Sequence, residues 1–145
     1  MAFANPSDAQ IRSLLKQVQQ IAVVGLSPNK DRPSYKVAAA LQGFGYRIIP
    51  VRPMTAEVLG EKAYPDLATV PGQIDLVDVF RAPEQVGEVV DACIARKLPA
   101  VWLQEGIVNE AAAQRAQAAG LTVVMDRCVY REYVRLFGAV PRSAL

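Results

Sequence analysis

The fold is decided by Ile21-Ala22-Val23-Val24-Gly25-Leu26-Ser27-Pro28-Asn29-Lys30-Asp31-Arg32-Pro33-Ser34, residues 21–34. The stretch opens with a short continuous apolar run that ends at Gly25, a pattern typical of a strand buried on both faces. A polar loop with two prolines follows, and Ser34 is expected to cap the next helix. The apolar side of that helix comprises Val37, Ala38, Leu41 and Phe44. A buried strand, a loop and an amphipathic helix in this order are typical of an α/β unit.

The same alternation continues along the rest of the chain. Further strands are predicted at residues 47–51, 74–80, 99–103 and 121–125. Helices are predicted at residues 7–19, 34–44, 83–94, 109–119 and 128–137. Residues 55–70 are expected to be irregular apart from a short extended piece at 60–65, and Pro50 is expected to end its strand. The short connections favour a doubly wound, five-stranded parallel sheet of the Rossmann-like type, in a three-layer α/β/α sandwich.

The composition is that of one globular domain, predicted to comprise residues 1–145. Hydrophobic residues make up 52% and charged residues 21%, a balance that can bury a core. No run approaches the roughly 18 apolar residues of a membrane helix, and the first residues lack the pattern of a secretory signal. Cys93 and Cys128 match no metal-binding spacing and give no disulfide framework. We therefore expect a cytoplasmic protein without a metal.

The absence of histidine and the small net charge argue against histidine-based catalysis and against nucleic-acid binding. The chain has no histidine, the commonest general base and metal ligand. Its formal net charge of +2 is too small to indicate a nucleic-acid partner. The charge is uneven, however, because five basic residues and a single acid, Asp31, lie between Lys30 and Arg52. This part of the chain is expected to face anions.

The loop after the first strand is the candidate phosphate site. In open parallel sheets, ligands bind beyond the carboxyl ends of the strands where the strand order reverses. Gly25 permits a tight turn there, and the first amides of the next helix can face an anion. Hydroxyls are offered by Ser27 and Ser34, and positive charge by Lys30, Arg32 and Lys36.

The sequence after the second strand, Ile49-Pro50-Val51-Arg52-Pro53, narrows the choice of nucleotide. The dinucleotide fingerprint G-x-G-x-x-G is absent, since Ser27 and Lys30 stand where its second and third glycines would be. NAD-binding proteins place an acidic residue after this strand, whereas Arg52 suits a ribose phosphate. Both NADP and coenzyme A (CoA) carry such a phosphate, and Arg52 does not separate them. A surface ion pair of Arg52 with Glu57 or Asp31 is the structural alternative.

Five segments together resemble the family of stand-alone CoA-binding proteins, which is similar to the CoA-binding domain of the succinyl-CoA synthetase α subunit. They are Val23-Val24-Gly25-Leu26-Ser27, Ile49-Pro50-Val51-Arg52-Pro53, Gly60-Glu61-Lys62-Ala63-Tyr64-Pro65, Val79-Phe80-Arg81-Ala82-Pro83 and Trp102-Leu103-Gln104-Glu105-Gly106. No single segment is diagnostic, but their order and spacing are. The resemblance runs from about residue 10 to residue 136.

The resemblance implies a position for each part of CoA. The loop with Gly25, Ser27, Lys30, Arg32 and Lys36 would hold the phosphates. The adenosine end would be flanked by Pro50, Val51 and Arg52. The remaining cleft would be lined by Phe80, Arg81, Glu105, Gly106 and Ile107. The synthetases also use a phosphorylated histidine and an ATP-grasp unit, and because this chain has neither, ligase activity is not implied.

Three other features are candidates with simpler structural explanations. Cys128 lies near a helix start beside Arg127, where a thiol could react with CoA, but ordinary packing is favoured for it, as for Cys93. Glu105 is a possible ligand contact, although turn formation is favoured. Arg127, Arg131 and Arg135 form one helical face with Tyr130 and Tyr133, either solvated or in contact with a second copy or an enzyme partner.

These observations favour a non-catalytic cytosolic protein that binds CoA or acyl-CoA. One alternative is an NADP-dependent oxidoreductase, which the missing glycines and the absence of a proton-transfer group disfavour. Another is a regulatory subunit that docks on an acyl-CoA enzyme through the arginine face.

Overall fold

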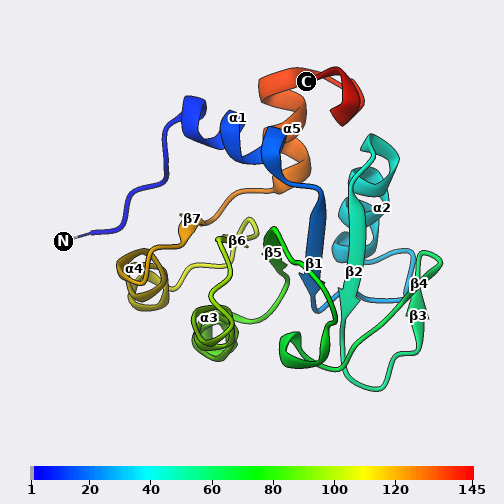
Figure 1. Cartoon of the computed structure of the whole chain (residues 1–145), viewed down its shortest axis with the longest axis horizontal. Coiled ribbons are helices and arrows are strands. Elements are labelled where there is room, and N and C mark those ends of the chain that lie inside the picture. The colour runs from blue at the N-terminus through cyan, green and yellow to red at the C-terminus, as the bar shows by residue number, and fades with distance from the viewer. Residues whose placement is uncertain (1) are drawn as a thin grey trace.

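The computed structural model describes residues 2–145, in which helices and strands alternate (Figure 1). The helices are α1 (Asp8–Gln17), α2 (Pro33–Phe44), α3 (Val86–Ala95), α4 (Glu110–Ala118) and α5 (Val129–Phe137). The strands are β1 (Gln20–Val24), β2 (Arg47–Val51), β3 (Glu57–Val58), β4 (Glu61–Lys62), β5 (Leu76–Val79), β6 (Ala100–Leu103) and β7 (Thr122–Val124). Short 3₁₀ helices are η1 (Leu67–Thr69), η2 (Pro83–Gln85) and η3 (Arg142–Ala144). Within these described residues, no helix has the length and apolarity needed to cross a bilayer.

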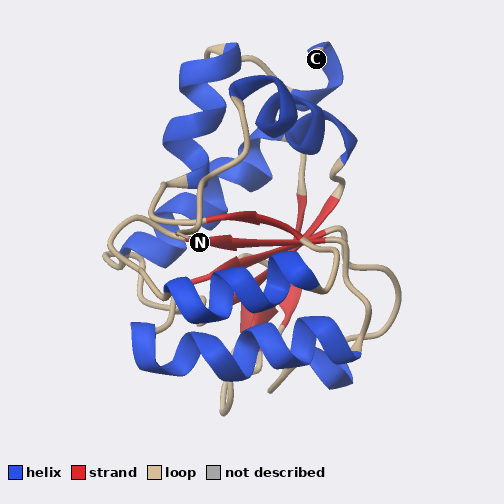
Figure 2. Cartoon of the chain, turned by 90° about the vertical axis from the view of Figure 1, so that its left-hand side faces the viewer, coloured by secondary structure: helices blue, strands red, loops and turns tan. Residues whose placement is uncertain are grey.

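Five strands form one parallel sheet in the order β2-β1-β5-β6-β7. In Figure 2 their arrowheads point to the same side, with helices packed above and below. The predicted Rossmann-like, doubly wound sheet is therefore confirmed. The chain runs from β1 outward to β2 and then returns to β5 on the other side of β1. The strand order thus reverses between β1 and β5, and this edge is where such folds bind ligands.

Side chains of each strand alternate between two apolar cores. In β1, Ile21 and Val23 join the core under α1, α2 and α5, whereas Ala22 and Val24 join the core under α3 and α4. Burial on both faces explains why each strand is a continuous apolar run in the sequence. Trp102 is fully buried in the first core, as predicted, and its indole N–H donates to the carbonyl of Arg127 at 2.8 Å.

The ends of most helices follow the predicted local signals. Ser7 caps α1, where its hydroxyl accepts from the amide of Gln10, and Asn109 caps α4. Gly45 ends α2 in a left-handed conformation, with φ of 110°. The two side-chain caps and the glycine turn give hydrogen-bond partners to terminal backbone N–H and C=O groups that have none within the helix.

Two local expectations are wrong. Ser34 does not cap α2, because the helix begins at Pro33 and the cap residue is Arg32, which forms no side-chain cap. Proline favours the first helical position, where no N–H is needed. Pro50 does not end its strand, since β2 continues to Val51. Because β2 is an edge strand, the missing N–H of proline is tolerated there.

The segment between β2 and β5 is more ordered than expected. β3 and β4 form a small antiparallel hairpin, and Tyr64 forms a parallel bridge with Val51. Further along, the guanidinium of Arg96 donates to the carbonyls of Leu67, Val70 and Gly72 at 2.5–2.7 Å. These contacts fix η1 against the carboxyl end of α3.

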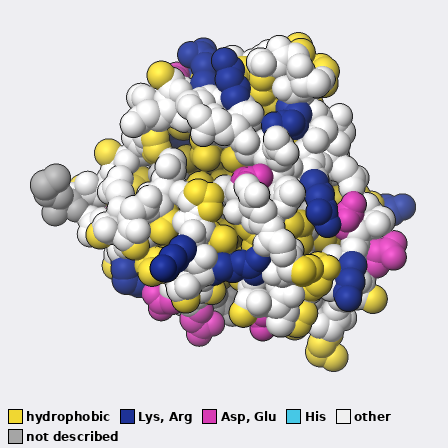
Figure 3. Space-filling model, in the orientation of Figure 1, with side chains coloured by type: hydrophobic (Ala, Val, Ile, Leu, Met, Phe, Trp, Pro, Cys, Tyr) yellow, Lys and Arg dark blue, Asp and Glu magenta, His cyan; other side chains and the backbone are white. Residues whose placement is uncertain are grey.

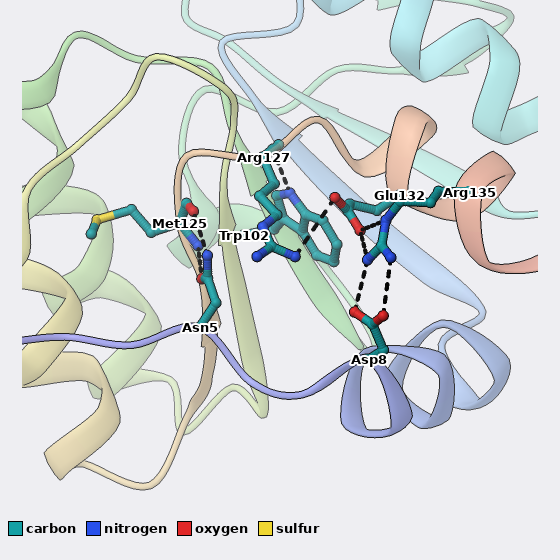
Figure 4. A network of polar contacts seen from close by, with 7 residues as sticks. All are labelled: Asn5, Asp8, Trp102, Met125, Arg127, Glu132 and Arg135. Carbon is teal, nitrogen blue, oxygen red and sulfur yellow. Dashed lines mark hydrogen bonds and ion pairs between the residues drawn. The ribbon is translucent and has the colours of Figure 1, made fainter.

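Figure 4 shows how α5 is joined to the first residues of the chain. Arg135 donates to both carboxylate oxygens of Asp8, at 2.8 and 3.0 Å, and to Glu132. These hydrogen bonds from Arg135 lower the pKa of Asp8 below its ordinary value. Nearby, the side-chain amide of Asn5 donates to the carbonyl of Met125 at 3.0 Å and accepts from its N–H at 2.8 Å. Asn5 thus bonds the backbone N–H and carbonyl of the residue directly after β7, the strand at one edge of the sheet.

Candidate functional site: the crevice between β1 and β5

Gly25 forms the floor of the crevice. It follows β1 with φ of +87°, and a Cβ at this position would lie 2.2 Å from the carbonyl oxygen of Phe80, the residue after β5. Only glycine fits both this conformation and this space. The N–H of Gly25 donates to the carbonyl of Val51 at 2.8 Å, and that of Phe80 to the carbonyl of Val24 at 2.9 Å. The carboxyl ends of β2, β1 and β5 are therefore tied together.

The loop after Gly25 is shaped by its own polar side chains. The amide of Ser27 donates to the hydroxyl of Ser34 at 3.0 Å, and the amide of Asn29 donates to the hydroxyl of Ser27 at 3.1 Å. The amide of Asp31 then donates to the side-chain oxygen of Asn29 at 2.9 Å. Because Ser27 and Ser34 are both buried, their hydroxyls stabilise the loop from within.

The amino end of α2 offers backbone donors at the mouth of this loop. Pro33 has no N–H, and the first helical bond there runs from the amide of Lys36 to the carbonyl of Arg32 at 3.2 Å. The amides of Ser34 and Tyr35 form no hydrogen bond within the described chain. Free amides at the positive end of a helix dipole favour an anion.

Arginines stand at the ends of two strands beside Gly25. The amide of Arg52 donates to the carbonyl of Tyr64 at 2.8 Å, so the bridge after β4 holds the Arg52 backbone in place. Arg52 and Arg81 are half-buried, and Arg32 is exposed. Within residues 2–145 these three guanidinium groups form no ion pair, and the predicted alternative pairing of Arg52 with an acid is not observed. Their charges are free to meet an anion.

Three neighbouring hollows extend across this edge of the sheet. The α2 hollow, of about 590 Å³, is lined by Gly25, Ser27, Pro28, Asn29, Arg32, Pro33, Ser34, Arg52, Phe80, Arg81 and Ile107. The middle hollow, of about 390 Å³, is lined by Gly25, Arg52, Pro53, Phe80, Arg81, Ala82 and Gln85. The α3 hollow, of about 310 Å³, is lined by Val24, Val51, Pro65, Asp66, Leu67, Arg81, Gln85, Glu88, Val89 and Ala92. Arg81 lines all three, so they lie next to one another from α2 to α3, and together they are called the groove below.

The structure gathers most of the predicted site residues around this groove. The α2 hollow contains the predicted residues Gly25, Ser27, Arg32, Ser34, Arg52, Phe80, Arg81 and Ile107, and Val51 lines the α3 hollow. The walls supplied by η1 and α3 were not predicted from the sequence. These residues follow no glycine or charge pattern in the sequence.

Five predicted site residues do not line the hollows. Lys30 and Lys36 are exposed beside the loop, and the ring of Pro50 lies within β2. Glu105 instead forms an ion pair with Arg131, whose Nη1 lies 3.0 Å from each carboxylate oxygen. The amide of the fifth residue, Gly106, donates a hydrogen bond to the carboxylate of Asp126. Local charge in the sequence does not reveal where a flexible side chain points, which explains the differences at Lys30, Lys36 and Glu105.

The predicted arginine face of α5 is paired within the chain. Arg131 binds Glu105, Arg135 binds Asp8 and Glu132, and Arg127 lies 3.7 Å from Glu132. Figure 3 shows one face of the molecule, on which Lys and Arg side chains lie in small groups separated by neutral atoms. Arg127, Arg131 and Arg135 therefore each form an ion pair with an acid of the same chain.

Neither cysteine adds chemistry to the groove. Both thiols are free, and burial raises the pKa of Cys93 to about 12, so that thiol stays protonated at neutral pH. Cys128 is half-buried at the start of α5. Across residues 2–145, no group of three His, Cys, Asp or Glu side chains is arranged to hold a metal ion.

Asp78 is a buried acid that the sequence analysis did not single out. It lies in β5 between Val23 of β1 and Trp102 of β6, and its side chain has no exposed surface. Neither carboxylate oxygen has a hydrogen-bond partner. Burial therefore raises the pKa of Asp78 well above its ordinary value. It is enclosed in the core and does not line the groove.

The parallel sheet and its reversed strand order define a Rossmann-like α/β protein, and unpaired arginines line the crevice at the point of reversal. The chain belongs to the family of CoA-binding domains, which matches residues 19–134. It is 46% identical to the protein YneT of Bacillus subtilis over 125 residues, covering 86% of this chain and 93% of that one.

Solved structures and larger enzymes extend these similarities. A hypothetical protein from Pyrococcus horikoshii is 37% identical, with a TM-score of 0.88 over 95% of this chain and 100% of that chain. A Thermus thermophilus protein is 35% identical, with a TM-score of 0.87 over 91% of this chain and 100% of that one. An ADP-forming acetate–CoA ligase of Archaeoglobus fulgidus is 27% identical over 95 residues, which are 63% of this chain but only 14% of the ligase.

Proposed function

We propose that this chain binds CoA or an acyl-CoA in the groove between α2 and α3 and performs no catalysis of its own. The observation that carries the proposal is the set of unpaired guanidinium groups of Arg32, Arg52 and Arg81, all three of which line the α2 hollow. CoA carries three phosphate groups, and guanidinium groups recognise phosphate through charge-assisted hydrogen bonds. Membership of the CoA-binding domain family supports the same ligand.

The diphosphate of CoA is assigned to the α2 hollow and the ribose phosphate to the middle hollow. Arg32 and Ser34 line the α2 hollow, and the unbonded amides of Ser34 and Tyr35 lie at the amino end of α2, the end of a helix that favours an anion. In the middle hollow, Arg52 and Arg81 approach from the ends of neighbouring strands. Both hollows share Gly25, so the two phosphate positions are adjacent.

The absence of catalysis is proposed from the side chains that reach the groove. Its titratable lining residues are arginines and the acids Asp66 and Glu88, and the chain has no histidine. The similarity to the acetate–CoA ligase covers a small part of that enzyme. A binding or carrier role needs no further groups.

Titration calorimetry with CoA tests the proposal. We expect saturable binding that weakens as salt is raised, since exposed phosphate contacts are screened. Dephospho-CoA, NADP and NAD serve as comparison ligands, and CoA should bind tightest. Incubation with ATP, acetate and CoA should leave the free thiol concentration unchanged. Absence of CoA binding, or ATP-dependent loss of the thiol, would contradict the proposal.

Arg52→Ala is expected to weaken CoA binding by about 1 to 3 kcal/mol, or roughly 5- to 150-fold in Kd. The backbone of Arg52 is fixed by Tyr64, so the guanidinium is presented to the ribose phosphate with little loss of freedom. Calorimetric titration of wild type and variant measures the change.

Two controls accompany this measurement. Dephospho-CoA lacks the 3′-phosphate, and wild type and Arg52→Ala should bind it almost equally. Arg47→Ala removes the same charge from the exposed opposite end of β2 and should leave CoA affinity unchanged. Equal weakening of CoA and dephospho-CoA by Arg52→Ala would show that Arg52 does not contact the 3′-phosphate.

A further inference from the structure

A separate hollow lies at the β7 edge of the sheet, the edge opposite to β2. This β7 hollow, of about 500 Å³, is lined by residues 4–6, by α1, by Gln117 of α4 and by residues 121–123. It shares no lining residue with the groove, and Figure 1 shows β7 between α1 and α4. Its volume lies within the range of small-molecule sites. Among the described residues that line it, none is Lys, Arg, Asp or Glu, so it suits an uncharged ligand.

One pair of backbone groups, the N–H and carbonyl of Val123, lies on the open side of β7 beside this hollow. Alternate residues of β7 bond to β6, beginning with the amide of Thr122, which donates to the carbonyl of Pro99 at 2.9 Å. Both backbone groups of Val123 therefore point away from β6. Neither forms a hydrogen bond within residues 2–145. Because Val123 is buried, a ligand that bonds to this pair recovers free energy.

The chain itself shows which chemical group fits such a pair. Two residues further along the same edge, the carboxamide of Asn5 accepts from the N–H of Met125 at 2.8 Å and donates to its carbonyl at 3.0 Å (Figure 4). A carboxamide can accept and donate at once, whereas a carboxylate cannot donate and an ammonium group cannot accept. We propose that the β7 hollow binds a small, uncharged molecule through a carboxamide group, which pairs with Val123 as Asn5 pairs with Met125.

The side chains of the hollow supply further neutral donors and acceptors for the rest of the ligand. The side-chain oxygen of Gln10 accepts from the amide of Ser7 at 2.8 Å, which leaves its NH₂ group to donate. The NH₂ group of Gln17 donates to the hydroxyl of Ser13 at 3.2 Å, which leaves the Gln17 oxygen to accept and the hydroxyl to donate. Leu121 adds an apolar wall. These groups can orient an uncharged molecule whose carboxamide is bound at Val123.

NMR titration of the isotope-labelled protein with three probes of similar size tests the proposal. Benzamide can both donate and accept, acetophenone can only accept, and benzoate accepts but carries a charge. We expect benzamide to shift the amide signal of Val123 saturably, with a Kd at least about tenfold lower than that of either other probe. Absence of a saturable shift at Val123, or equal affinity for the three probes, would overturn the proposal. Saturating CoA should leave the benzamide titration unchanged, and competition would place benzamide in the groove instead.

Two variants test the site from different sides. Ser13→Phe places a ring on the lining of the β7 hollow, whereas Ala9→Phe places the same ring one turn earlier on α1, on an exposed residue outside the lining. We expect Ser13→Phe to weaken benzamide binding at least about tenfold and Ala9→Phe to leave it unchanged. Val123→Pro removes the N–H but no bond to β6, a change that an edge strand tolerates, as β2 does at Pro50, and it should abolish benzamide binding in ligand-observed NMR. Thermal unfolding reports whether each variant is folded, and unchanged benzamide affinity in either folded variant, Ser13→Phe or Val123→Pro, would overturn the assignment.

Discussion

Gly25→Ala is expected to lower the free energy of unfolding by about 2 to 5 kcal/mol and to abolish CoA binding. The left-handed conformation of Gly25 costs an alanine about 1 to 2 kcal/mol, and the new Cβ would lie 2.2 Å from the carbonyl oxygen of Phe80. That oxygen belongs to the backbone, so it moves only if β1 and β5 separate. Separation would displace Arg81 and the loop that begins at Gly25. Denaturant unfolding and calorimetric titration measure the two effects.

Gly72→Ala is the matched control for this variant. Gly72 has φ of +79°, close to that of Gly25, but a Cβ there meets nothing within 4 Å. It should therefore show only the conformational cost, about 1 to 2 kcal/mol, with no change in CoA affinity. Equal destabilisation by the two variants would mean that the contact with Phe80 relaxes easily and does not shape the crevice.

Asp78→Asn is expected to stabilise the protein at neutral pH and to flatten the dependence of its stability on pH. The raised pKa means that the folded state keeps a proton that the unfolded state releases above about pH 4, the ordinary value for aspartate. Below that pH the acid is protonated in both states, and no stability is lost. As pH rises, ionisation favours the unfolded state by up to about 1.4 kcal/mol per pH unit, until the folded-state pKa is reached.

Unfolding by denaturant between pH 5 and pH 8 measures this difference. The gap in unfolding free energy between Asp78→Asn and wild type should widen as pH rises, because asparagine cannot ionise. Glu84→Gln removes an exposed carboxyl group and should follow the wild-type curve. Parallel curves for Asp78→Asn and wild type would show that the carboxyl group of Asp78 is solvated or paired in solution.

The surrounding polar side chains support a protonated Asp78 in the folded state. Three polar side chains of the same core bond elsewhere: Trp102 donates to the carbonyl of Arg127, Tyr46 to that of Leu15 and Tyr133 to that of Val140. None of them is available to an ionised Asp78.

The sheet could be predicted from the sequence because its strands are buried on both faces. Continuous apolar runs such as Ile21–Val24 locate such strands directly, and cap residues such as Asn109 locate the helix starts. The extended piece expected at 60–65 contains β4 and the bridging Tyr64, but β3 and its pairing with β4 were missed, since a two-residue strand carries too little pattern to be recognised.

The site was only partly predictable for a different reason. Glycine and arginine at the carboxyl ends of strands follow a positional rule, and this rule located Gly25 and Arg52, whereas Arg81 was expected from the family resemblance. The α3 hollow instead combines residues from β1, η1 and α3, which are distant in the sequence and individually ordinary. Ser34 was assigned as a helix cap, but its hydroxyl holds the loop through Ser27, because both roles suit the same side chain.

Asn5 and Pro50 bear on how the molecule behaves when it is concentrated. Exposed sheet edges recruit strands from other molecules and so promote aggregation. At the β7 edge, the side-chain amide of Asn5 bonds both the N–H and the carbonyl of Met125, the residue directly after β7. The edge strand β7 itself has only three residues. At the β2 edge, Pro50 removes a donor and Tyr64 is paired with Val51. Extension of the sheet by a second chain would first have to break these contacts.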